Sequence, residues 1–221
     1  VMAGVFGSIA ARISGAKFIY HCMDIHPELG SLSGDFKNML LYSILRKIDL
    51  WSCQSATKIV VLSEDMAQSL VERSVLLKEK IEVLNNFSLP SIEGETEAYE
   101  WPENKHVILF AGNVGRFQGL QGLIRTVAKL QKSHDLALVI MGEGVLKESL
   151  ERLVGELQAN VHFIDQKSIK TAKAAMLRAD LAFVSLLPGI YRYAFPSKTI
   201  TYLEQGCPIL ACIEPESVLA A

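Results

Sequence analysis

The sequence lacks the features that mark a membrane-spanning, disulfide-linked or nucleic-acid-binding chain. No uninterrupted apolar run reaches the roughly 18 residues that a transmembrane helix needs. Four cysteines occur without a CxxC pair or a regular spacing, which favours buried reduced thiols in a cytosolic protein. The formal net charge of −2 argues against a dedicated nucleic-acid binder. A globular protein of the cytoplasm is therefore expected.

The two ends of the sequence lack recognisable targeting signals. Val1–Ile13 is apolar, but no basic residues precede it and no obvious cleavage site follows it, so it does not indicate a signal peptide. The chain begins at a valine and stops soon after a strand-like segment. We therefore expect a piece of a longer protein, cut at both ends.

Apolar residues are plentiful, and charge is unevenly distributed. Half of the residues are hydrophobic and the mean hydropathy is +0.25, so the chain can bury a substantial core. Residues 91–104 contain five glutamates and neither lysine nor arginine, together with a glycine and a proline. This composition is typical of a linker, which we place at residues 89–105. It separates a first domain at residues 1–88 from a second at residues 106–221.

Strand-like apolar runs alternate with amphipathic segments on both sides of the linker. Before it, helices are predicted at 1–14, 36–52 and 65–73, and strands at 17–22, 58–62 and 81–84. After it, strands are predicted at 107–111, 136–141, 161–164, 181–185 and 209–213, and helices at 120–132, 146–158, 169–178 and 197–205. This alternation predicts parallel sheets with right-handed crossovers.

The segment Phe195–Leu210 combines helix signals with a cation. Ser197 is a natural N-cap for a short helix, which a glycine and a proline then end. A helix that begins beside Lys198 would offer unpaired backbone N–H groups and a positive charge, which are the ingredients of a phosphate site. Ile209–Ile213 follows as an expected buried strand. The alternative is an ordinary helix beside the sheet with a surface lysine.

A second candidate is the glycine loop, Gly112–Gly119, between a predicted strand and a predicted helix. Glycines allow the backbone to approach a ligand closely, and successive N–H groups can surround an anion. The loop does not match the GxGxxG fingerprint, and no acidic residue ends the next strand, which argues against NAD. The alternative is a tight strand-to-helix turn without a ligand.

A third candidate lies in the first domain, where His21, Asp24, His26 and Glu28 surround the end of a predicted strand. This edge of a parallel sheet is where ligands collect. Two carboxylates and two imidazoles suit metal ligation or acid–base chemistry, although their spacing fits no metal motif. The alternative is a turn that Asp24 and Pro27 merely shape.

The order Pro-Ser-Lys, Tyr-Leu and Gly-x-Pro-Ile-Leu over residues 196–210 resembles the donor-site segment of family 4 glycosyltransferases. The likeness covers residues 15–215 and is strongest to the branch that builds bacterial capsule, O-antigen and colanic-acid-like polysaccharides. It implies an α/β, GT-B-like fold of two Rossmann-like parallel-sheet domains, the N-terminal one incomplete. It also implies a retaining enzyme that moves a sugar from a nucleotide-diphosphate-sugar to a glycan or lipid-linked acceptor, without a cofactor, a metal or a nucleic-acid partner.

The resemblance assigns roles to individual residues. Lys198 would contact the donor diphosphate and stabilise the charge of the leaving group. Asp24 would be the candidate catalytic base, with His26 and Glu28 on the acceptor side. The segment 164–167 would lie near the nucleobase. The implied donor-binding residues are Gly112, Asn113, Gly115, Arg116, Ser197, Lys198, Thr201 and Tyr202.

The chain departs from the family pattern at three positions. Two family cations that hold the diphosphate correspond to Asn113 and Gln118, and Arg116 is the candidate replacement for one of them. The glutamate that contacts the donor ribose corresponds to Thr201, whose hydroxyl can bind a sugar hydroxyl but supplies no carboxylate.

These departures leave two alternatives to a transferase. One is a non-catalytic sugar-nucleotide-binding or scaffold module descended from a transferase, and the other is a GT-B nucleotide-sugar epimerase. For the transferase, peripheral contact with the inner face of the membrane is the expected form of membrane association. The 221 residues alone are expected to be inactive.

Overall fold

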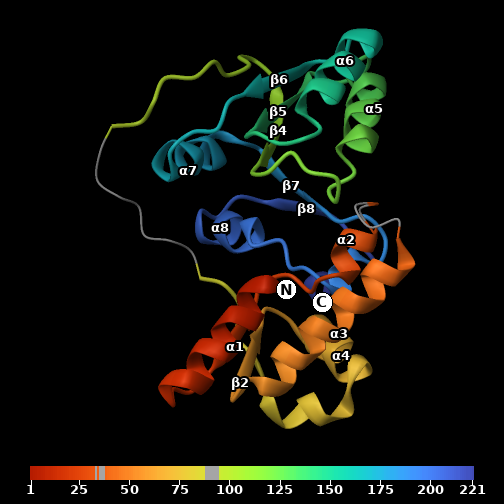
Figure 1. Ribbon diagram of the computed structural model, residues 1–221. Helices are drawn as coiled ribbons and strands as arrows, with labels where there is room; N and C mark the ends of the chain where they lie inside the picture. Colours follow the sequence, from red (N-terminus) through yellow and green to blue (C-terminus); the bar gives the residue numbers. More distant parts are fainter. Residues whose placement is uncertain (33, 35–37, 88–94) are drawn as a thin grey trace. The chain divides into compact units, whose positions relative to one another are not determined.

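The computed structural model describes residues 1–32, 34, 38–87 and 95–221 (Figure 1). These residues form two compact units. Unit 1 comprises Val1–Asn86, Pro188–Phe195 and Ile213–Ala221, and unit 2 comprises Phe87–Leu187 and Pro196–Cys212. The sequence analysis placed residues 106–221 in one uninterrupted domain, whereas two short segments of that range pack with unit 1. The first part of the expected linker, residues 89–94, and the expected helix start at Phe36 lie outside the described residues.

Unit 1 contains a small parallel sheet with strand order β1-β2-β3. Its helices are α1 (Met2–Ser14), α2 (Glu28–Leu32), α3 (Met39–Ser55) and α4 (Glu64–Arg73), with a 3₁₀ helix at Val75–Lys80. Its strands are β1 (Ile19–Cys22), β2 (Lys58–Val61) and β3 (Ile81–Val83). The core is formed by fully buried apolar side chains such as Ile25, Cys53, Ile59, Met66 and Leu70.

Local capping signals explain where the helices of unit 1 begin. The Ser63 hydroxyl accepts a hydrogen bond from the Met66 N–H, so Ser63 caps α4. The Asn38 side chain accepts from two N–H groups of the first turn of α3 in the same way. Within the described parts of the chain, no helix is both long and apolar enough to cross a membrane.

A buried ion-pair network joins three helices of unit 1. The side chain of Arg73, at the end of α4, is 2% exposed. Its guanidinium donates to the Glu28 carboxylate, to Asp49 Oδ2 at 2.6 Å and to the His26 carbonyl at 2.8 Å. Tyr20 OH donates to the other Asp49 oxygen at 2.8 Å. Since every buried charge finds an opposite partner, the network fixes the turn that leads from β1 into α2.

Unit 2 contains a five-stranded parallel sheet with strand order β6-β5-β4-β7-β8. Its strands are β4 (His106–Ala111), β5 (Leu136–Met141), β6 (Val161–Ile164), β7 (Leu181–Ser185) and β8 (Ile209–Cys212). Its helices are α5 (Leu120–Leu130), α6 (Lys147–Leu157), α7 (Ile169–Arg178) and α8 (Lys198–Glu204). Helices α5 and α6 cover one face of the sheet and α7 lies on the other (Figure 1). The expected α/β architecture with parallel sheets is confirmed.

The last strand is not buried as expected. β8 is the outer strand of the sheet, and Leu210 in its middle is 45% exposed. Its final residue, Cys212, is also exposed, whereas the other three cysteines are buried, and all four are free thiols. The apolar run Ile209–Ile213 therefore indicated a strand correctly but not its burial, because burial depends on the position of the strand in the sheet.

The described second half of the expected linker, residues 95–104, is docked although it forms no helix or strand. The Glu97 carboxylate accepts the Ser168 N–H at 2.7 Å at the start of α7. At the end of α7 the Arg178 guanidinium lies 5.0 Å from the Trp101 ring centre. This segment is therefore held along α7 from the first turn of the helix to the last.

We expect Arg73→Met to destabilise unit 1 by about 3–5 kcal/mol, because it leaves the buried carboxylates of Glu28 and Asp49 without their shared cation. Urea unfolding followed by Trp51 fluorescence, with Trp101 replaced by Phe, would measure the change in unit 1.

Arg46→Met is the matched control for this substitution. Arg46 also contacts Glu28, at 3.0 Å, but its side chain is 45% exposed, so it should cost no more than about 1 kcal/mol. Equal effects of the two substitutions would contradict the importance of the buried network.

Candidate functional site

The candidate site lies at the carboxyl ends of the strands of unit 2. From β4 the chain builds the sheet outward through β5 and β6, and it then returns to place β7 on the other side of β4. The strand order therefore reverses between β4 and β7. In open parallel sheets, ligands bind outside the carboxyl ends of the strands at such a reversal.

The glycine loop follows β4 and is fixed against the turn that follows β5. Gly112 N–H donates to the Met141 carbonyl at 2.9 Å, and Val114 N–H donates to the Glu143 carbonyl at 2.8 Å. A Cβ at Gly142 would lie 2.1 Å from the Gly112 oxygen, so this turn requires glycine. The amides of Gly112 and Val114 are thus already hydrogen-bonded. Only the remaining N–H groups of the glycine loop are candidates to surround an anion.

Lys198 points its side chain toward the start of the glycine loop. Its Nζ lies 3.4 Å from the centre of the Phe110 ring, near the end of β4. A Cβ at Gly112 would lie 3.2 Å from the same atom, so the missing side chain leaves the space that the ammonium group occupies. The residue is half-buried as a whole, yet its Nζ is shielded from solvent and has no hydrogen-bond partner among the described residues. The alternative of a surface lysine is therefore wrong.

Burial of this group changes its protonation. Desolvation lowers the pKa of Lys198 to about 7, and no carboxylate among the described residues pairs with its Nζ to offset the lost hydration. The face of the Phe110 ring offers the cation negative electrostatic potential. Sequence reasoning did not identify Phe110, since an aromatic residue in an apolar strand looks like any other core residue. A lysine held in this way is suited to receive an anion.

Helix α8, which carries Lys198, is anchored by two side chains of its C-terminal half. The Ala111 N–H at the end of β4 donates to Tyr202 OH at 2.8 Å, and Tyr202 is fully buried. Burial raises the pKa of Tyr202, so the phenol stays neutral. Lys173 of α7 pairs with Glu204, the last residue of α8, at 2.8 Å. The structure therefore places Tyr202, an expected donor-binding residue, in the core, where it positions α8.

The start of α8 differs from the expectation. Ser197 has helical backbone angles (φ −54°, ψ −25°), and its side chain makes no capping hydrogen bond. Capping requires extended angles at that position, so the expected cap is wrong. The N–H groups of Thr199 and Ile200 donate to the carbonyls of Pro196 and Ser197. These donors are consequently already paired, and the lysine side chain remains as the feature of α8 that suits an anion.

Two amide side chains converge within the glycine loop. A Cβ at Gly115 would lie 2.9 Å from Asn113 Nδ2 and 3.3 Å from Gln118 Oε1, so glycine makes room for both. The Gln118 oxygen is buried and has no hydrogen-bond partner among the described residues. Arg116 is exposed, and Thr201 is half-buried in the first half of α8. The roles of these residues toward a donor stay predictions.

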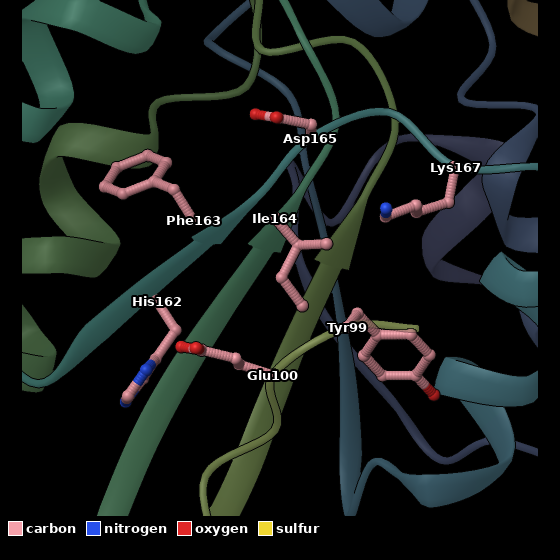
Figure 2. A pocket seen from close by; sticks show the side chains of 7 residues that line it. All are labelled: Tyr99, Glu100, His162, Phe163, Ile164, Asp165 and Lys167. Carbon is pink, nitrogen blue, oxygen red and sulfur yellow. The ribbon is translucent and has the colours of Figure 1, made fainter. Parts of the chain in front are cut away.

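A pocket of about 270 Å³ lies beside β6 (Figure 2). Asp165 follows the carboxyl end of β6 and pairs with Lys147 at 2.5 Å, and hydrogen bonding to that lysine lowers the pKa of Asp165. Tyr99 and Glu100 line the pocket from the segment held along α7. The complete lining is Tyr99, Glu100, His162, Phe163, Ile164, Asp165 and Lys167. The pocket thus includes part of the segment expected near a nucleobase.

The cluster expected in unit 1 is divided by the structure. Asp24 lies at the surface and its backbone pairs with Ala194, while partial desolvation raises the pKa of its carboxyl against the opposing effect of His26. Glu28 points into the buried network with Arg73, so its carboxylate is committed to ion pairs and unavailable to an acceptor. Over the described ranges, no three His, Cys, Asp or Glu side chains are placed to hold a metal ion.

We expect the difference in stability between Lys198→Met and the wild type to depend on pH. Between pH 7 and 10.5 the unfolded lysine binds a proton that the folded one does not, so wild-type stability rises with pH. The free energy of unfolding of Lys198→Met, relative to that of the wild type, should therefore fall by about 1.4 kcal/mol per pH unit between pH 7.5 and 9.5. Urea unfolding at each pH, followed by Trp101 fluorescence in a Trp51→Phe background, measures the stability difference between the variant and the wild type.

The exposed Lys129 of α5 provides the matched control, Lys129→Met. Its stability difference from the wild type should not change over the same pH range. A pH-independent difference for Lys198→Met as well would show that the buried ammonium is not desolvated in the way described.

The chain resembles known glycosyltransferases in sequence. The chain is 26% identical over 209 residues to WbjE of Pseudomonas aeruginosa, named as a probable glycosyltransferase, which covers 90% of this chain and 52% of WbjE. It is 25% identical over 244 residues to WcaI of Escherichia coli K12, provisionally named as a colanic acid biosynthesis glycosyl transferase, which covers 96% of this chain and 60% of WcaI. The chain thus spans between about half and three fifths of the length of these relatives.

The fold has solved counterparts. The structure of HepE from Anabaena in complex with UDP-glucose superposes with a TM-score of 0.68 at 16% identity, over 95% of this chain and 57% of HepE. This likeness concerns the fold alone and confirms the expected GT-B-like class. The profile of the family described as "Glycosyl transferases group 1" matches residues 91–214, which is more than half of the chain. The chain therefore belongs to the group 1 glycosyl transferases.

Proposed function

We propose that unit 2 binds a nucleotide-diphosphate-sugar and that the whole protein is a retaining glycosyltransferase of cell-envelope polysaccharide synthesis. The buried, unpaired ammonium of Lys198 beside the glycine loop is the observation that carries the proposal. Family membership and the UDP-glucose complex of HepE support it. The acceptor would be a glycan or a lipid-linked sugar. Whether the transferred sugar is a hexose or an N-acetylhexosamine is left open.

In this proposal Lys198 supplies the electrostatic part of catalysis. The donor diphosphate would bring two negative charges to an ammonium group that has lost its hydration, where the attraction is much stronger than in water. As the sugar–phosphate bond breaks, further charge develops on the leaving phosphate, and the same ammonium would stabilise it. The leaving diphosphate would then help to deprotonate the acceptor on the same face of the sugar, which retains the anomeric configuration.

Other residues would bind the remaining parts of the substrates. We assign the backbone amides of the glycine loop other than those of Gly112 and Val114 to the diphosphate, and the segment 164–167 to the nucleobase. In unit 1, Asp24 is the proposed base and His26 an acceptor contact, while Glu28 is withdrawn because of its ion pairs. No cofactor or metal is proposed. A cytoplasmic location with peripheral contact at the inner membrane face completes the proposal.

A second candidate is a binding module without catalysis. The uncharged Asn113 and Gln118, and Thr201 in place of a carboxylate, favour it. Such a module would bind a nucleotide sugar in unit 2, yet a full-length protein would show no turnover with any acceptor. No observation among the described residues specifically favours the epimerase alternative.

We expect UDP-glucose to bind the chain with uptake of about half a proton at pH 7, since the diphosphate would raise the pKa of Lys198 from about 7. The dissociation constant should rise by up to about tenfold per pH unit between pH 7 and 9, as less of the lysine is protonated. Calorimetric titration in buffers of different ionisation enthalpy measures both quantities.

Lys198→Met should weaken this binding at least about tenfold and abolish the proton uptake. Lys129→Met should change neither quantity. Binding that is unaffected by Lys198→Met would contradict the assignment. If UDP-glucose fails to bind, titrations with GDP- and ADP-linked sugars test whether another base is recognised, and failure of all three donors would overturn the proposed function.

A further inference from the structure

Two buried polar atoms that find no hydrogen-bond partner in the described part of the chain lie beside the same loop of unit 2. Lys198 Nζ lies against Gly112 at the start of the glycine loop, and Gln118 Oε1 lies against Gly115 in its middle. The first is a cation and the second is a hydrogen-bond acceptor. They consequently require different partners, an anion for the lysine and a donor hydrogen for the glutamine oxygen.

A phosphate group cannot satisfy Gln118 Oε1. Phosphate oxygens at neutral pH are acceptors, so the two oxygens would repel each other, whereas a hydroxyl group carries the hydrogen that the amide oxygen needs. A buried acceptor left without a hydrogen is costly, and a site of this kind discriminates strongly against ligands that lack the matching hydroxyl. The side-chain oxygen of Gln118 therefore favours a hydroxyl group, such as that of a carbohydrate, over a phosphate as its partner.

The backbone holds Gln118 in place. Its main-chain carbonyl accepts a hydrogen bond from the hydroxyl of Ser185, at the end of β7. The carbonyl of the preceding residue, Phe117, accepts from the Leu187 N–H at 2.7 Å. The loop is thus tied to β7, on the side of β4 where the strand order reverses. These bonds fix the backbone position of Gln118 at the candidate site, from which its side chain extends.

We propose that Gln118 is a specificity-determining residue whose side-chain oxygen accepts a hydrogen bond from a hydroxyl group of the nucleotide-sugar donor. This inference rests on the proposed function. In the resembling family the corresponding residue is a cation that holds the diphosphate, so glutamine changes what the position recognises. Lys198 would then bind the diphosphate, and Gln118 would bind a carbohydrate hydroxyl of the same ligand.

Calorimetric titration of the 221-residue chain with pyrophosphate, UDP and UDP-glucose tests this inference. Pyrophosphate carries no hydroxyl of a sugar, UDP carries those of ribose, and UDP-glucose adds those of glucose. Gln118→Met keeps the length of the side chain and removes the acceptor. It should weaken binding of UDP-glucose by roughly tenfold to a hundredfold and leave binding of pyrophosphate unchanged.

The probe at which the loss first occurs identifies the hydroxyl. A loss that is already complete with UDP assigns the contact to the ribose, and a loss confined to UDP-glucose assigns it to the transferred sugar. Gln118→Lys should strengthen pyrophosphate binding through its added charge. Like Gln118→Met, it should lose the tighter binding of probes that carry the recognised hydroxyl. Gln121→Met, at an exposed position of α5, is the matched control and should bind all probes as the wild type does.

Equal weakening of all three probes by Gln118→Met would overturn the inference, because it would place the side chain on the phosphates. Unchanged binding of all three would overturn it as well. If binding depends on Lys198 but not on Gln118, this inference fails and the proposed function stands. If the folded wild type binds none of the UDP-, GDP- and ADP-linked sugars, both fail.

Discussion

The desolvated charge of Lys198 is the constraint on which the rest of unit 2 depends. An ammonium group without hydration or a counter-charge is unfavourable in a folded protein, so the surrounding structure must hold it in place. Tyr202 fixes α8 to the end of β4, and Glu204, the last residue of α8, ties the helix to α7. Gly112 leaves the space and Phe110 supplies the aromatic face. A local loss of stability is thereby kept at the point where an anion would relieve it.

In unit 1, by contrast, the buried charges of the Arg73 network are paired with one another. Arg73 finds Glu28, Asp49 and a backbone carbonyl, so no charge in that network is left for a ligand. Its effect is structural, because it fixes the turn between Asp24 and α2. The contrast separates two kinds of buried ion in one chain: the paired set shapes the backbone, and the unpaired lysine suits binding.

Secondary structure was predictable where local signals suffice. The expected bounds of β5, β6, α7 and β7 match the structure, since each apolar period is bracketed by polar or turn residues. The cap at Ser63 follows from the same kind of local signal. The prediction of a cap at Ser197 is wrong, because the backbone angles of Ser197 are helical. The prediction that β8 is buried is wrong, because an outer strand and a central strand can have the same apolar run.

The candidate site was harder to predict because its contacts are long-range. The motif resemblance indicated Lys198, but its unpaired state depends on which side chains the fold brings near it. Tyr202 was assigned to the donor and lies in the core, since periodicity does not distinguish a pocket from an interior. Glu28 was assigned to the acceptor, yet it pairs with Arg73, which is 45 residues away in the sequence. The domain borders were hard to predict for the same reason, because the segments Pro188–Phe195 and Ile213–Ala221 belong to unit 1 through long-range contacts.

The most direct test of the central claim is the titration of Lys198 itself, with and without UDP. Nuclear magnetic resonance of the labelled lysine side-chain nitrogen would follow its protonation, with Lys198→Met used to assign the signal. The account predicts a pKa of about 7 in the empty protein and a shift of at least about two units upward when UDP is bound. A lysine that titrates at its ordinary pKa in both states, or that does not respond to UDP, would contradict the account.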